Sequence, residues 1–141
     1  MRQSCLKFSF KMNTIYIVDD SADQRFLLSF LLKRINPKYE LVVFDGARAL
    51  LDMLSRVKEN GADYPQVIFL DYQMPEMDGY EALTILKSKD QGSAGYVEVP
   101  VVIYSSSSDR DLIQKCLESG AFAFLQKPVN LDELKNLLRS M

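Results

Sequence analysis

Five polar side chains that could do chemistry together follow apolar segments of the sequence. They are Asp19, Asp20, Asp71, Ser105 and Lys127. Solvated loops would account for any one of them, but account poorly for three carboxylates, a hydroxyl and an ammonium in equivalent places. Carboxylates gathered in one cleft repel one another, so one or more should keep a proton at neutral pH unless a cation binds. Since the candidate ligands are oxygens and the chain has no histidine, Mg²⁺ or Mn²⁺ suits such a site better than zinc or copper.

This set of groups suits the transfer of a phosphoryl group. Catalysis of that reaction consists mostly of positioning and of neutralising charge on the phosphoryl oxygens. A carboxylate is a competent nucleophile, so Asp71 would attack phosphorus, Lys127 and the metal ion would stabilise negative charge, and Ser105 would donate a hydrogen bond. The product would be a labile mixed anhydride on the aspartate.

The elements that must position these groups alternate between strand and helix. Short β-branched runs predict strands, and apolar residues at spacings of three and four predict helices. Ser21 is a candidate N-cap, and Ser108 with Asp111 resembles a capping box. The predicted strands are 14–18, 40–44, 66–70, 99–104 and 121–125, the predicted helices lie around 26–35, 49–57, 82–86, 108–120 and 131–138, and an exposed loop is predicted over 89–98.

Strict alternation of this kind predicts an α/β fold, in which a five-stranded parallel sheet is doubly wound by helices on both faces. Right-handed crossovers leave few other ways to bury both surfaces of the sheet. Ligand sites in such sheets form outside the carboxyl ends of the strands, where the strand order reverses. The polar groups follow strand ends, so we expect them to converge there.

Size and charge exclude several classes of protein. The 141 residues, 48% of them hydrophobic, allow one domain with a continuous core. The 17 basic and 19 acidic residues lack the basic excess that is typical of nucleic-acid binding. No apolar run approaches the length of a membrane span, and the two cysteines lie far apart in the sequence. We therefore expect a cytoplasmic protein without nucleic-acid or membrane partners.

Four segments form a specific, ordered pattern. They are Ile17 to Asp20 (IVDD), Phe69 to Gly79 (FLDYQMPEMDG), Pro100 to Ser105 (PVVIYS) and Lys127-Pro128. The pattern resembles the receiver domain of the bacterial two-component response regulators, in particular the stand-alone regulators of the chemotaxis type. This resemblance implies a flavodoxin-like (βα)5 fold with strand order 2-1-3-4-5. The Lys127-Pro128 bond is cis in much of the family.

The resemblance covers the chain from about Asn13 to its end. It implies a receiver domain over residues 13–141, preceded by an N-terminal extension, residues 1–12, that is disordered or not native. Strand one of the family normally starts within a few residues of the N-terminus, whereas here about a dozen residues precede it.

A phosphoacceptor and a metal site also follow from the resemblance. Asp71 matches the phosphoacceptor. Asp20 and Asp71 match the direct metal ligands, together with the backbone carbonyl of Gln73. Asp19 matches the outer ligand, which binds the metal through water.

Three further side chains match groups that respond to phosphorylation. Ser105 and Lys127 match the family's hydroxyl and lysine, and Phe124 matches an aromatic that rotates inward when the hydroxyl moves toward the phosphoryl group. The sequence pattern alone favours Phe124 as a plain core residue, and only its family position indicates a switch. Ser106 stands where the family more often has alanine, but its backbone N–H can still contact the phosphoryl group.

The implied function is that of a signalling switch in a two-component phosphorelay, rather than that of a turnover enzyme. The chain has no histidine, so a histidine kinase or histidine phosphotransfer protein must supply the phosphoryl group in trans. The phosphorylated chain would then bind a downstream protein target or pass the phosphoryl group onward.

Two other functions remain open. A Mg²⁺-dependent phosphatase of the haloacid dehalogenase type also uses an aspartate nucleophile on a parallel sheet. Such enzymes place a second aspartate two residues after the nucleophile, where this chain has Gln73. The other alternative is a degenerate receiver that acts only as a non-phosphorylated scaffold. The complete set of carboxylates, with Ser105 and Lys127, argues against it.

Overall fold

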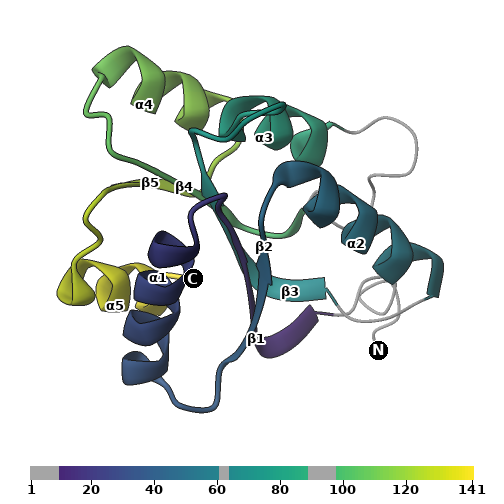
Figure 1. Ribbon diagram of the computed structural model, residues 1–141, viewed down its shortest axis with the longest axis vertical. Helices are drawn as coiled ribbons and strands as arrows, with labels where there is room; N and C mark the ends of the chain where they lie inside the picture. Colours follow the sequence, from purple (N-terminus) through teal and green to yellow (C-terminus); the bar gives the residue numbers. More distant parts are fainter. Residues whose placement is uncertain (1–9, 61–63, 89–97) are drawn as a thin grey trace.

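The computed structural model describes residues 10–60, 64–88 and 98–141. Strands and helices alternate along this part of the chain, as Figure 1 shows, and all neighbouring strands are parallel. The strands are β1 (Phe10–Val18), β2 (Glu40–Phe44), β3 (Tyr64–Asp71), β4 (Val101–Ser105) and β5 (Ala123–Gln126). The helices are α1 (Ala22–Ile35), α2 (Ala47–Asn60), α3 (Gly79–Lys87), α4 (Arg110–Glu118) and α5 (Leu131–Arg139). The order of the sheet, β2-β1-β3-β4-β5, confirms the predicted fold.

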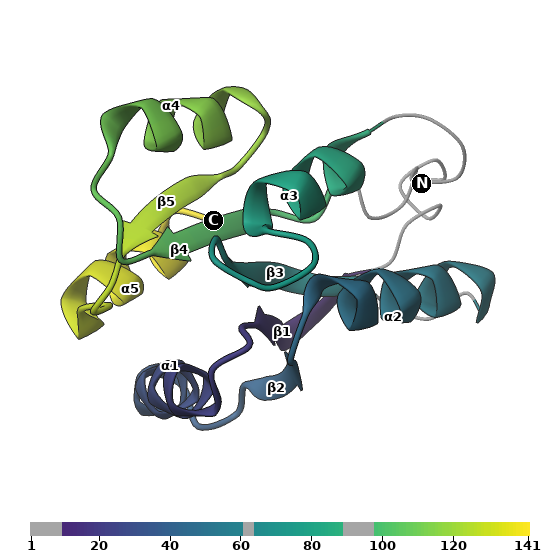
Figure 2. The same ribbon diagram turned by 45° about the horizontal axis from the view of Figure 1, so that its top comes forward.

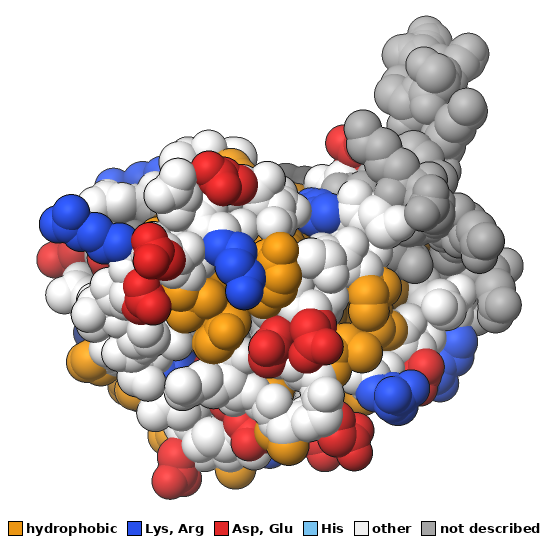
Figure 3. All heavy atoms as spheres, turned by 90° about the horizontal axis from the view of Figure 1, so that it is seen from above, with side chains coloured by type: hydrophobic (Ala, Val, Ile, Leu, Met, Phe, Trp, Pro, Cys, Tyr) orange, Lys and Arg blue, Asp and Glu red, His pale blue; other side chains and the backbone are white. Residues whose placement is uncertain are grey.

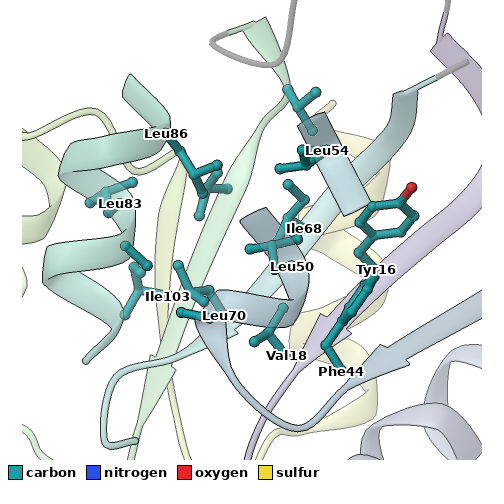
Figure 4. Close-up of a cluster of buried hydrophobic side chains, with 14 of the residues drawn as sticks. Tyr16, Val18, Phe44, Leu50, Leu54, Ile68, Leu70, Leu83, Leu86 and Ile103 are labelled. Carbon is teal, nitrogen blue, oxygen red and sulfur yellow. The ribbon is translucent and has the colours of Figure 1, made fainter. Parts of the chain in front are cut away.

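The two faces of the sheet are covered by different helices. Helices α1 and α5 lie on one face, and α2, α3 and α4 lie on the other (Figure 2). Side chains alternate along a strand, so Ile15 and Ile17 of β1 pack toward α1 and α5, whereas Tyr16 and Val18 pack toward α2 and α3. Figure 4 shows this second cluster, in which side chains of α2 and α3 meet those of the central strands. Both sheet faces are therefore buried, as the continuous apolar runs predict.

The surface carries charges of both signs. Figure 3, which views the molecule from above, shows acidic and basic side chains interspersed with apolar ones. This mixture matches the near balance of 17 basic and 19 acidic residues. Within the described residues, no helix is both long enough and apolar enough to cross a membrane.

Helix starts follow the capping residues, with one correction. Ser21 is the N-cap of α1, as predicted, and its hydroxyl accepts the Gln24 N–H at 3.3 Å. The N-cap of α4 is Asp109, not Ser108. Asp109 has extended backbone angles, and its carboxylate accepts the Asp111 N–H at 2.9 Å. The carboxylate thus satisfies a free N–H of the first turn, so the helix begins one residue later than the predicted capping box required.

The first strand is longer than predicted. It begins at Phe10 rather than at Thr14, and so includes residues 10–12, which were predicted to belong to the extension. The pairing of β1 with β3 shifts register between Lys11 and Ile15. An irregularity of this kind lets a strand continue past residues that break its apolar pattern, which is why the pattern did not predict the longer strand.

Other strand boundaries differ from the prediction by one or two residues. The Val99 carbonyl accepts Lys87 Nζ at 2.8 Å, and β4 starts only at Val101. The Ala121 N–H donates to the Cys116 carbonyl at 3.1 Å, which closes α4, and β5 starts at Ala123. Strand β3 begins at residue 64 instead of 66. The loop predicted over 89–98 lies almost entirely outside the described residues.

Candidate functional site

The carboxyl ends of β1 and β3 bring three predicted carboxylates together. Asp71 ends β3 and Asp19 follows β1, and since Val18 pairs with Leu70 in parallel register, the residues that follow lie side by side. Asp19, Asp20 and Asp71 can each offer one carboxylate oxygen within 4.8 Å of the others. Asp19 and Asp71 are 0% and 2% exposed, whereas Asp20 is exposed. The site is therefore a buried acidic pair with one carboxylate open to solvent.

Lys127, which follows the outer strand β5, contacts both buried carboxylates. Its backbone N–H donates to the Ser105 carbonyl at 2.8 Å, and its peptide bond to Pro128 is cis, as the family resemblance implied. Its Nζ lies 3.0 Å from Asp71 Oδ1 and 3.3 Å from Asp19 Oδ2. Since both carboxylates are buried, loss of this ammonium would leave uncompensated buried charge.

Two residues that hold Asp19 were missed by sequence reasoning. The Tyr104 hydroxyl donates to Asp19 Oδ2 at 2.8 Å, and Arg25 Nη1 donates to the Asp19 carbonyl at 2.7 Å. The Ser21 N–H donates to Asp19 Oδ1 at 2.9 Å. One signal could have pointed to Tyr104: it is the residue with a polar tip in the otherwise aliphatic run VVIY that precedes Ser105.

The electrostatics of the site disfavour the charged carboxylate of Asp71. Burial raises the pKa of Asp71 from 3.8 to about 6, and the charge of Asp19 adds to this effect, while the hydrogen bond from Lys127 opposes it. Burial, followed by the charge of Asp19, also raises the pKa of Tyr104. A cation bound among the carboxylates would relieve the repulsion, so the donor set fits a hard metal ion with oxygen ligands.

A close backbone approach shapes the loop that follows Asp71. The Gly79 N–H donates to the Tyr72 carbonyl at 2.8 Å, so α3 begins directly against the end of β3. A Cβ atom on Gly79 would lie 2.5 Å from the Asp71 carbonyl oxygen and 2.8 Å from Tyr72 Cα. Gln73, whose carbonyl is the predicted metal ligand, is exposed in this loop. Glycine is therefore required where the helix meets the site.

Of the remaining predicted site residues, Ser105 and Ser106 lie at the carboxyl end of β4, whereas Phe124 lies within β5. Ser105 is 0% exposed, and its hydroxyl accepts the Ser107 N–H at 3.1 Å. Ser106 is exposed. Phe124 is half-buried and packs against the cluster that lies under α2, α3 and α4. The roles of these residues in phosphoryl transfer remain predictions.

The fold and this cluster of groups define a class of protein. The family model of the response regulator receiver domain matches residues 15–139. The chain belongs to this family, whose members are phosphoacceptor signalling switches, and the match does not favour a phosphatase of the dehalogenase type.

Curated relatives of the chain include two-component response regulators of plants. The chain is 38% identical over 131 residues to ARR6 of Arabidopsis thaliana, covering 90% of this chain and 68% of ARR6. It is 36% identical over 123 residues to ORR3 of Oryza sativa subsp. indica, covering 87% and 86%. It spans only 56% of a third relative, the rice regulator ORR4. The qualifier "bacterial" in the sequence prediction is therefore not supported.

Solved structures of receivers have the same fold. The chemotaxis regulator CheY4 of Vibrio cholerae is 25% identical with a TM-score of 0.74, and the match covers 93% of this chain and all of that one (100%). The Mn(2+)-bound form of the response regulator Rcp1 is 26% identical with a TM-score of 0.69, and the match covers 90% and 89%. The prediction that the chain is a receiver domain is confirmed.

Proposed function

We propose that Asp71 is the residue that accepts the phosphoryl group in this receiver. The observation that supports this most strongly is the position of Lys127 Nζ between the buried carboxylates of Asp71 and Asp19, at 3.0 and 3.3 Å. An ammonium in that place lies beside the oxygens that a phosphoryl group on Asp71 would introduce. Charge-assisted hydrogen bonds of this kind are the strong ones in a buried site.

The carboxylates fit a Mg²⁺ ion, or Mn²⁺. Asp20 and Asp71 would bind the ion directly with the backbone carbonyl of Gln73, and Asp19 would bind it through water. When bound, the ion would neutralise negative charge on the phosphoryl oxygens. The mutual distance of the three carboxylates, within 4.8 Å, supports this assignment, as does the similarity to the Mn(2+)-bound form of Rcp1.

In the proposed reaction, a carboxylate oxygen of Asp71 attacks the phosphorus of a phosphohistidine in line. An acyl phosphate forms as the phosphorus–nitrogen bond breaks, and the electron pair of that bond returns to the donor imidazole. Lys127 Nζ, the Ser105 hydroxyl and the Ser106 N–H would donate to the phosphoryl oxygens. Ser105 would shift toward them and Phe124 would turn inward, which changes the surface that a partner reads.

The partners follow from this chemistry. The chain has no histidine, so the donor is a histidine kinase or histidine phosphotransfer protein, and the phosphorylated form binds a downstream protein target or passes the group on. Slow loss of the phosphoryl group would make the chain a self-modifying switch rather than a turnover enzyme. The place of action that we propose is the cytoplasm, where a thiol such as that of the free, buried Cys116 stays reduced. The division into an extension, 1–12, and a receiver domain, 13–141, remains a proposal.

Phosphorylation by a small donor tests the assignment. Wild-type protein incubated with acetyl phosphate and Mg²⁺ should gain the mass of one phosphoryl group in intact mass spectrometry. Asp71→Asn should gain none, because an amide is a poor nucleophile. Asp52→Asn is a matched control, since Asp52 is an exposed aspartate on α2, and it should be modified like the wild type.

Two outcomes would contradict the proposal. One is a wild-type protein that stays unmodified by acetyl phosphate and by a phosphorylated histidine phosphotransfer protein. The other is modification that persists in Asp71→Asn. Sustained turnover of p-nitrophenyl phosphate would instead indicate a phosphatase.

A further inference from the structure

Tyr104 is a buried side chain that contacts two of the charged groups of the site. It is 1% exposed and lies on the sheet face covered by α1 and α5. Its hydroxyl donates to Asp19 Oδ2 at 2.8 Å, and its ring centroid lies 4.8 Å from Lys127 Nζ. An ammonium at this distance from an aromatic face is attracted by the ring. One side chain thus holds a carboxylate with its tip and an ammonium with its ring.

The sheet fixes the position of Tyr104. Its residue pairs with Asp71 on one side and with Leu125 on the other, and its carbonyl accepts the Tyr72 N–H at 2.9 Å. The backbone is thus fixed, and since the side chain is 1% exposed among packed neighbours, the ring has little freedom to follow the charged groups if they move. A rigid donor of this kind orients its partners instead of adapting to them.

Tyr104 and Lys127 compete for the same carboxylate oxygen. Asp19 Oδ2 accepts the Tyr104 hydroxyl at 2.8 Å and Lys127 Nζ at 3.3 Å, while Ser21 occupies Oδ1. Lys127 makes its shorter contact, 3.0 Å, with Asp71 Oδ1. Two donors on one oxygen share its negative charge, so the hydroxyl weakens the hold of Asp19 on the ammonium.

We propose that Tyr104 is a positioning residue, which occupies Asp19 with its hydroxyl and supports Lys127 with its ring so that the ammonium is directed to Asp71. Without the hydroxyl, Lys127 moves toward Asp19 and away from the oxygens on which phosphoryl transfer takes place. The consequence for the reaction rate rests on the proposed function of Asp71. The direction of the ammonium does not depend on it.

The position of the ammonium is measured in the metal-free protein. NMR couplings across the hydrogen bond, from Lys127 ¹⁵Nζ to a carboxylate ¹³Cγ, report which aspartate accepts it. In the wild type the coupling should connect Lys127 to Asp71. In Tyr104→Phe, which keeps the ring, it should move to Asp19. An unchanged coupling to Asp71 in Tyr104→Phe would overturn the proposal.

A double variant should restore the coupling between Lys127 and Asp71. In Tyr104→Phe with Asp19→Asn, the competing charge is gone, so Lys127 should couple to Asp71 again. This variant also decides the matter if Tyr104→Phe alone does not fold, because loss of the Lys127–Asp71 coupling there would contradict competition for Asp19.

The rate of phosphorylation is the second measurement. With acetyl phosphate and Mg²⁺ saturating for each protein, Tyr104→Phe should be modified about tenfold more slowly, because a small misplacement of a catalytic group has an effect of at least this size. Tyr16→Phe is the matched control: Tyr16 is a buried tyrosine of β1 that packs on Phe44 across the opposite face of the sheet. It should stay within about twofold of the wild type, because its side chain packs on the sheet face opposite to Tyr104.

The two measurements separate the proposals. If the wild type takes up no phosphoryl group, the proposed function fails, and the NMR couplings still decide the role of Tyr104. A rate in Tyr104→Phe equal to that of the wild type would overturn the positioning role even where the couplings move.

Discussion

Neighbouring residues at the carboxyl ends of β1 and β3 lie in different environments, although all of them are buried. Val18 and Leu70 are 0% exposed and pack among the aliphatic side chains under α2 and α3. The next residues, Asp19 and Asp71, are 0% and 2% exposed and share the ammonium of Lys127. Apolar burial stabilises the interior without regard to direction. At the carboxyl ends of the strands, each buried carboxylate needs particular hydrogen-bond donors, since a buried charge without them is costly.

The apolar interior thus stabilises the fold, whereas the carboxyl end of the sheet is arranged to bind a ligand. Burial of apolar side chains favours folding, whereas the carboxyl ends of β1 and β3 bring like charges together at a cost in stability. The pKa of Asp71, raised to about 6, reflects the cost of holding this carboxylate charged in a buried place. Removal of an apolar side chain from the interior should therefore lower the free energy of unfolding, whereas neutralising the buried carboxylate of Asp71 should raise it.

The largest effect is expected from a cavity in the interior. Leu83→Ala removes a fully buried side chain of α3, so the free energy of unfolding should fall by about 2–5 kcal/mol. Leu117→Ala is the matched control, because Leu117 is 43% exposed on α4, and it should cost under ~1 kcal/mol. Urea unfolding of both variants measures the difference. Equal losses would show that the apolar interior does not dominate stability.

A smaller effect is expected where the interior meets the edge. Gly79→Ala would place a Cβ 2.5 Å from the Asp71 carbonyl oxygen, and backbone must shift to admit it. The cost should be about 1–3 kcal/mol, with slower phosphorylation because Asp71 moves. Gly46→Ala has no atom within 4 Å of the new Cβ and serves as the control. A Gly79→Ala protein as stable as Gly46→Ala would show that the close approach is not tight in solution.

The sequence predicted the sheet and its polar edge because both rest on simple patterns. Parallel strands buried on two faces are continuous apolar runs, and the groups that follow them must meet at one edge. Asp71 and Lys127, 56 residues apart, were placed together in this way and lie 3.0 Å apart.

What the sequence could not predict depends on fine geometry. Ser108 and Asp109 are both good N-caps, and only the backbone angles select Asp109. Tyr104 fits a strand as a plain aromatic, and its contact with Asp19 joins residues 85 apart in the chain. Strand β1 starts before its apolar run because backbone pairing with β3 continues past a register shift.

Neutralising Asp71 should raise the free energy of unfolding of the metal-free protein, whereas the two changes above lower it. Burial raises the pKa of Asp71 from 3.8 to about 6, so the folded protein binds its proton more tightly than the unfolded chain. In the metal-free protein, the contribution of this proton to stability is present below about pH 4 and is lost as the pH rises toward 6. Asp71→Asn removes this loss. In EDTA at pH 7 the variant should be more stable than the wild type by about 1–2 kcal/mol. The amide fills the same space without a buried negative charge, and this gain outweighs the lost ion pair with Lys127.

Urea unfolding from pH 4 to pH 7 measures the effect, because the advantage of Asp71→Asn should grow across this range and be small at pH 4. Adding Mg²⁺ is the control: an ion that binds only the folded state stabilises it in proportion to the logarithm of its concentration over its Kd. Mg²⁺ should therefore stabilise the wild type more than the variant and reduce the gap at pH 7. A metal-free Asp71→Asn protein less stable than the wild type at pH 7 would mean that the ion pair with Lys127 outweighs the burial of the carboxylate. The edge of the sheet would then be stabilised by its charges, as the interior is by its apolar side chains.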